Sequence, residues 1–239
     1  MKLYDKLIGE TAELLAPATP SVYAYDPGSC WADNGKSELV MMRDAAFELG
    51  GNNLPSVNFT MVTTTEGIVD KDEVCVYGPD LPQIHGPVSF ARIVVLEVED
   101  LGETEDEEKA YNAIRDLEFV RYHVYPTGYM VRVSSESNQE QVRLSKQAIS
   151  SGINFAKVGN DYISKYKALD SVKHAKIIFV VDSPVVEQLQ PYAKKVDDIT
   201  KTLTHILDGM ATDCSHCDMK AICDEVEGMK ELHLGKKKS

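Results

Sequence analysis

Two short runs of apolar residues place the strongest constraint on the fold of this chain. Residues 90–97 contain Ile93-Val94-Val95-Leu96 without a polar break, and residues 175–181 are also strongly apolar. A strand that is buried on both faces reads as a continuous apolar run, because neither face meets water. These runs therefore favour an α/β body whose central strands are covered on both sides.

Extended and helical patterns are mixed along the rest of the sequence, with no repeats. We predict further strands at residues 22–25, 56–63, 73–77, 129–133 and 141–144. We predict helices at residues 4–15, at about 105–120, after a cap at Ser145, at 162–169 and from Ser183-Pro184 onward. Pro191 lies inside the last pattern and is a position where the helix can kink or split.

These patterns predict an α/β fold with a mixed sheet and flanking helices. The long C-terminal helix is expected to lead into a short cysteine-rich tail. We accordingly divide the chain into an α/β domain, residues 1–182, and a C-terminal segment, residues 183–239, that holds the helix and the tail.

Composition excludes some classes of function. The 239 residues carry a net charge of −13, which argues against a nucleic-acid partner because phosphate binding needs a basic surface. No apolar stretch approaches the roughly 20 residues of a membrane span. The first residues include Lys2, Asp5 and Lys6 where a signal peptide would need an apolar run. We expect a cytoplasmic protein with no membrane partner.

Three of the five cysteines lie close together near the C-terminus. Cys214, Cys217 and Cys223 have the spacing Cys-x2-Cys-x5-Cys. Thiolates spaced by two residues can bind one metal from a single tight turn. We therefore predict that this segment binds an iron–sulfur cluster, with zinc as the alternative.

The cysteine cluster leaves one ligand position open. A structural zinc site needs four protein ligands, and a four-iron cluster usually takes four cysteines. The fourth ligand could be His216, His233, a small molecule or a partner chain. The alternative is a set of reduced thiols without metal, or a disulfide. Five cysteines without a paired pattern favour reduced or metal-bound thiols.

Four stretches resemble one known family in the same order along the chain. They are Phe-Glu-Leu-Gly-Gly at 47–51, the segment with Gly-Pro-Asp-Leu at 72–81, the segment with Arg-Leu-Ser-Lys at 142–152, and Lys-Ile-Ile-Phe-Val-Val-Asp at 176–182. They are similar to the middle domain of acetyl-CoA synthase, the beta subunit of the CO dehydrogenase/acetyl-CoA synthase complex. The likeness covers about residues 40–225.

The resemblance implies a role in anaerobic one-carbon metabolism, the acetyl-CoA pathway. CO dehydrogenase or corrinoid iron–sulfur protein subunits are the implied partners, and a homodimer is a further possibility. The family's nickel is held by Cys-Gly-Cys, which this sequence lacks, so nickel is not expected in this chain alone. Gln141 also stands where the family has a tryptophan. We therefore expect a stand-alone homologue, and the sequence does not identify catalytic residues or decide whether the chain belongs to the acyltransferase class.

The resemblance also suggests a basic pocket for an anionic ligand such as coenzyme A. Its candidate residues are Arg121, Arg132, Arg143 and Lys146, and ordinary ion pairing is the alternative for each.

Three hypotheses for the function of the chain follow from the cysteine spacing and the resemblance. The chain is an accessory protein that binds a metal or a cluster, or a non-catalytic interaction module with a structural zinc site. It could also be a coenzyme A-binding module whose cysteines are merely redox-sensitive.

Overall fold

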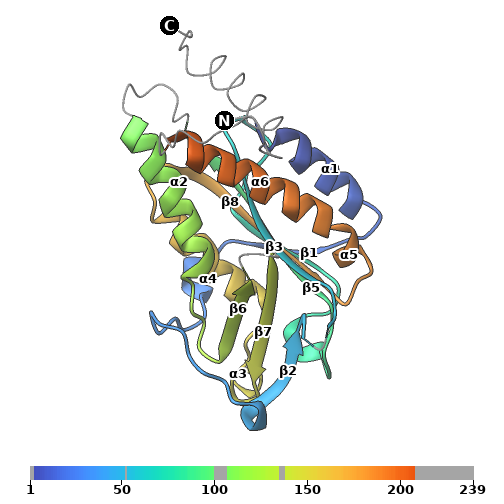
Figure 1. Cartoon of the computed structure of the whole chain (residues 1–239). Helices are drawn as coiled ribbons and strands as arrows, with labels where there is room; N and C mark the ends of the chain where they lie inside the picture. Colours follow the sequence, from blue (N-terminus) through green and yellow to red (C-terminus); the bar gives the residue numbers. More distant parts are fainter. Residues whose placement is uncertain (1–2, 52, 100–106, 135–137, 208–239) are drawn as a thin grey trace, which may run out of the picture.

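The computed structural model describes residues 3–51, 53–99, 107–134 and 138–207, with the backbone alone for 107–111 and 203–207. These residues form two β-sheets with helices packed around them (Figure 1). The predicted fold class, a mixed α/β body with flanking helices and a long C-terminal helix, is confirmed. The predicted cysteine-rich tail lies outside the described residues.

The larger sheet has the strand order β1-β4-β8-β5-β3. Its strands are β1 (Ser21–Ala24), β3 (Ser56–Thr63), β4 (Glu73–Tyr77), β5 (Phe90–Val98) and β8 (Val172–Val181). β3 is parallel to β5 and β4 is parallel to β8, whereas β5 and β8 run antiparallel at the centre. The two strands with the longest apolar runs thus lie side by side in the middle of the sheet.

The centre of this sheet is covered on both faces. Every residue of β3 and of β5 is buried. The apolar run of β5 predicts burial on both faces, whereas the alternating pattern of β3 predicts burial on one face only. Asn58 explains the difference, because its backbone N–H donates to the Asn138 carbonyl at 2.8 Å and its side-chain oxygen accepts from Arg121 at 2.7 Å. The polar residue Asn58 is therefore buried against polar partners.

Helices cover the larger sheet. α4 (Phe155–Lys167) packs against β4 and β8, and α2 (Glu107–Tyr122) packs against α4. α1 (Asp5–Leu15), α5 (Val185–Gln188) and α6 (Gln190–Leu207) pack against β3, and α1 and α6 lie side by side (Figure 1). The Tyr4 hydroxyl joins α1 to α6 through a 3.0 Å hydrogen bond with the Thr200 hydroxyl. No described helix is both long enough and apolar enough to cross a membrane.

Two predicted helices differ from the structure. α4 begins at Phe155 and not at residue 162, because the Asn154 side chain caps it by accepting from the Lys157 N–H at 2.9 Å. The helix predicted from Ser183-Pro184 is split into α5 and α6, which meet at Leu189, two residues before Pro191. The division at residue 182 stays a prediction, and α5 and α6 pack on the larger sheet.

The smaller sheet is antiparallel, with the strand order β2-β7-β6. Its strands are β2 (Ala45–Leu49), which the sequence patterns do not predict, β6 (Tyr129–Ser134) and β7 (Gln139–Ser145). The short helix α3 (Lys146–Ser150) follows β7, and Ser145 caps it as predicted, accepting from the Ala148 N–H at 3.0 Å. β7 contacts β3 and β5, so the smaller sheet packs against the larger one.

A buried ion pair joins the two sheets. Arg92 of β5 and Glu140 of β7 are both fully buried, and Arg92 Nε lies 2.9 Å from a Glu140 carboxylate oxygen. The Arg92 guanidinium also lies 4.3 Å from the centre of the Tyr162 ring on α4 and donates to the carbonyl of Arg121 at the end of α2. Burial works to lower the pKa of Arg92, but the Glu140 carboxylate, together with Tyr162 and Tyr166, outweighs it and holds the pKa above its usual value.

We expect Glu140→Gln to lower the free energy of unfolding by about 3–5 kcal/mol, because it leaves the Arg92 charge buried without a counter-ion. Urea denaturation measures this change. Asp197→Asn, which breaks the half-exposed ion pair with Lys201, serves as the control and should lower it by less than about 1 kcal/mol. If Glu140→Gln is as mild as this control, the buried pair does not hold the sheets together.

A second buried acid lies where the segment after β1 packs on α4. Asp161 is 4% exposed, and one of its carboxylate oxygens has no hydrogen-bonding partner within the described residues. Burial, together with the nearby Asp33 carboxylate, raises the pKa of Asp161 to about 7, although hydrogen bonds from Trp31 and Cys30 and the Lys165 charge work in the opposite direction. The folded chain therefore binds a proton here more tightly than the unfolded chain does.

We expect Asp161 to make the stability fall as the pH rises from about 4 to about 7. The unfolded carboxyl group releases its proton near pH 4, whereas the folded one keeps it until about pH 7, so the loss is on the order of 2–4 kcal/mol. Asp161→Asn, which stays neutral, should be more stable than the native chain at pH 8 and similar to it at pH 4. Urea denaturation at both values checks this, with exposed Asp70→Asn as a control that should show no such difference.

Candidate functional site

The predicted metal ligands lie outside the described residues. Cys214, His216, Cys217, Cys223 and His233 all belong to the segment 208–239. In the part of the chain that the structure describes, no group of three or more histidine, cysteine or acidic side chains could hold a metal ion. The metal site therefore stays a prediction from the sequence.

The predicted basic residues lie on both faces of the smaller sheet. Arg121 is buried on the side of the larger sheet, where its guanidinium donates to both Asn58 and Asn138. Arg143 alternates with the buried residues of β7 and therefore points to the opposite face. The pairing of β6 with β7 places Arg132 on that same face. Arg143 there pairs with Glu48 of β2 at 2.7 Å. Arg121 and Arg143 thus have structural partners and do not share one pocket.

Lys146 lies beside a groove of about 330 Å³. The groove is formed by the segment before β2 and by the β7–α3 junction. Arg43, Asp44 and Glu38 also line it, and Arg43 pairs with Asp44 at 3.5 Å. Lys146 donates to the Arg43 carbonyl at 3.0 Å, and Arg143 donates to the Val40 carbonyl at 2.9 Å. These bonds attach the segment to the smaller sheet. We name this feature the basic groove.

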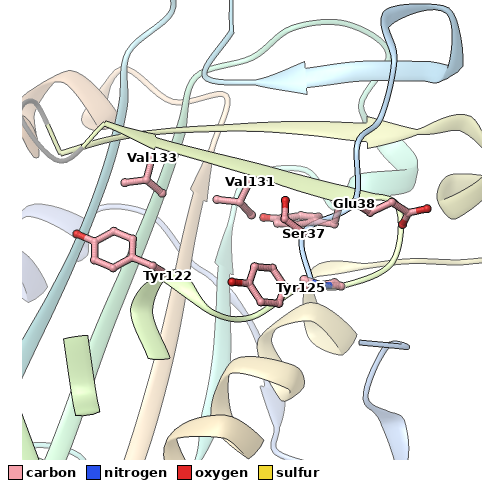
Figure 2. Close-up of a pocket in the computed structure, with 8 residues that line it drawn as sticks. Ser37, Glu38, Tyr122, Tyr125, Val131 and Val133 are labelled. Carbon is pink, nitrogen blue, oxygen red and sulfur yellow. The ribbon is translucent and has the colours of Figure 1, made fainter. Parts of the chain in front are cut away.

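A second cavity, of about 320 Å³, lies on the other side of Glu38, and we name it the tyrosine cavity. Figure 2 shows Val131 and Val133 of β6 across from Tyr122 and Tyr125. The remaining lining residues are Ser37, Glu38, Pro126 and Tyr129. The cavity combines aromatic and aliphatic walls with a few polar groups, which is the usual composition of a small-molecule site.

The polar groups of the tyrosine cavity are held in defined positions. Glu38 accepts from the Gly128 N–H at 2.9 Å. Burial raises the pKa of Tyr122, and it raises the pKa of Tyr129 well above the usual value. Both phenols are therefore neutral at physiological pH. The Tyr129 hydroxyl is buried and has no hydrogen-bonding partner within the described residues.

The sequence patterns do not single out these tyrosines. Tyr122, Tyr125 and Tyr129 lie at spacings of three and four residues, and this density is the only signal in the sequence. It is a weak signal, since tyrosines at such spacings also occur in ordinary cores. Tyr122 ends α2, Tyr125 lies in the connection and Tyr129 begins β6, so only the turn between these elements brings the rings together.

The residues that carry the family resemblance have structural roles. Gly78 has φ 110°, and a Cβ there would lie 2.1 Å from the Val181 carbonyl oxygen. The Asp80 carboxylate accepts from the N–H groups of Leu81 at 2.7 Å and of Phe155 at 2.9 Å, so it connects the end of β4 to the start of α4. These motif residues hold the fold together.

Comparison with known proteins supports the same relationship. The family model of the CO dehydrogenase/acetyl-CoA synthase complex beta subunit matches residues 33–186, which is more than half of the chain. The matched region includes the whole smaller sheet, four strands of the larger sheet and both cavities. No curated protein matches the chain. The chain therefore belongs to the CO dehydrogenase/acetyl-CoA synthase beta subunit family.

Proposed function

We propose that the chain is a metal- or iron–sulfur-binding accessory protein of the CO dehydrogenase/acetyl-CoA synthase system. The family match over residues 33–186 is the observation that supports the relation to this system, and the cysteine spacing at 214–223 is what suggests the metal. The protein would act in the cytoplasm, in anaerobic one-carbon metabolism. CO dehydrogenase or corrinoid iron–sulfur protein subunits would be its partners.

The metal would be bound by Cys214, Cys217 and Cys223, which follow α6 in the sequence. Three thiolates with one further donor fit either an iron–sulfur cluster or zinc. His216, His233, a small molecule or a partner chain would supply that donor. A cluster held by three cysteines leaves one iron open to a substrate or to a partner's ligand. Zinc would instead make the tail a structural element of an interaction module.

A second candidate function is binding of coenzyme A at the basic groove. Lys146 and Arg43 both line this groove, and its volume of about 330 Å³ could hold part of a phosphate-bearing ligand. Arg132 and Arg143 point to the outer face of the same sheet. Arg121 would not contribute, since its guanidinium binds Asn58 and Asn138.

We expect protein purified without oxygen to contain iron and acid-labile sulfide, and Cys217→Ser to lose most of both while the α/β body stays folded. Metal and sulfide analysis, a visible spectrum and circular dichroism measure this. Cys30→Ser, at a partly exposed cysteine far from the cluster in sequence, is the matched control and should keep its metal. Zinc without colour would favour the interaction module, and absence of any metal would contradict the proposal.

For the second candidate, we expect Lys146→Ala to weaken the binding of coenzyme A by about tenfold, because it removes a charge partner for the phosphates. Calorimetric titration measures the affinity, which should also fall as the salt concentration rises. Exposed Lys71→Ala is the control for a general loss of positive charge. Equal affinities of the two variants would show that the basic groove is not the coenzyme A site.

A further inference from the structure

We propose that the tyrosine cavity binds a small organic cation that carries an alkylammonium group. This inference does not depend on the proposed function. The cavity of about 320 Å³ could hold a molecule of this size. None of its eight lining residues, all within the described part of the chain, is a lysine or an arginine. Three of them are tyrosines, and one is a glutamate.

The aromatic walls supply the main attraction. The face of a tyrosine ring is the negative part of its quadrupole, so a cation within about 6 Å of the ring centre is attracted to it. Figure 2 shows the rings of Tyr122 and Tyr125 on one side of the cavity. Val131 and Val133 lie across from them and offer an apolar surface to the alkyl groups. This pairing of aromatic rings with aliphatic side chains suits an ammonium that is shielded by methyl groups.

The charges around the cavity favour a cation over an anion. Glu38 lines it, and Asp33 lies close by, with a carboxylate oxygen 3.5 Å from the Tyr125 backbone nitrogen. The Glu38 carboxylate points away from Tyr125 in Figure 2, so it acts through its field and not by direct contact. Two basic groups near the cavity are paired with acids. The Arg121 guanidinium lies over the Tyr122 ring, 5.1 Å from its centre, and pairs with Glu118 at 3.3 Å, while Lys165 pairs with Asp33 at 3.5 Å. Glu38 is therefore the acid that lines the cavity itself.

The exposed aromatic surface extends beyond the cavity. Phe119 is 58% exposed and Tyr122 is 36% exposed, one helical turn apart on α2. The His123 ring stacks on the Phe119 ring with 3.6 Å between the ring centres, and it forms a T-shaped pair with the Tyr125 ring with 6.0 Å between the centres. Rings that are this exposed contribute little to the packing of the hydrophobic core. A row of exposed rings next to a cavity is instead typical of a binding surface.

The test compares two ligands of nearly identical shape, choline and its neutral analogue 3,3-dimethylbutan-1-ol. Titration of the full chain with each, followed by ligand-observed NMR at constant ionic strength, gives the two dissociation constants. We expect choline to bind at least about tenfold more tightly, because both compounds bury the same alkyl groups but choline alone carries the charge. Absence of saturable choline binding, or equal affinities, would overturn the proposal.

Two substitutions at one position locate the binding. Tyr125→Leu removes the ring and should abolish the preference for choline, whereas Tyr125→Phe keeps the ring and should retain it. Tyr23→Leu, at an exposed tyrosine on β1, is the matched control and should leave choline binding unchanged. Circular dichroism verifies that each variant is folded. Choline binding that survives Tyr125→Leu, or that Tyr23→Leu also removes, would place the site elsewhere and refute the assignment.

Discussion

The arrangement of the two sheets depends on the buried contact between Arg92 and Glu140. The pair connects β5 to β7, and Tyr162 and the end of α2 complete its surroundings. Burying two charges is unfavourable unless they meet in good geometry, so a pair of this kind adds little net stability compared with apolar residues of the same size. It does oppose other arrangements of the sheets, because any shift would leave both charges buried and unpaired. We therefore interpret the pair as fixing the position of the smaller sheet.

The position of the smaller sheet in turn creates both cavities. The basic groove lies at the β7–α3 junction, and the tyrosine cavity lies between β6 and the connection from α2. Two of the predicted binding residues, Arg121 and Arg143, serve this construction through Asn58 and Glu48. A basic residue in the sequence is thus a poor guide to a binding role, because an arginine uses the same hydrogen bonds and ion pairs to hold the fold together as it would use to bind a ligand.

The central strands could be predicted because a strand that is buried on both faces, such as β5, appears in the sequence as a continuous apolar run. Ser145 directly precedes α3, so its role as the helix cap could also be predicted from neighbouring residues, and the structure confirms it. β2 was not predicted, because it pairs only with the distant β7, and its five residues carry no clear alternation. The start of α4 was predicted too late. Gly159 lies in the part that was missed, and its missing side chain allows close packing on Val74. The tyrosine cavity was missed because its walls come from several segments.

The sequence by itself determined the family, the mixed α/β class and a cysteine spacing suited to metal. These properties follow from local patterns and from short motifs such as Gly78-Pro79-Asp80-Leu81, whose Asp80 cap forms within a few residues. Only the tertiary structure decided that Arg121 and Arg143 face opposite sides of one sheet and that three tyrosines gather beside β6. Such placements depend on how the sheets pack and on where a helix ends, and contacts between distant residues leave no periodic signal in the chain.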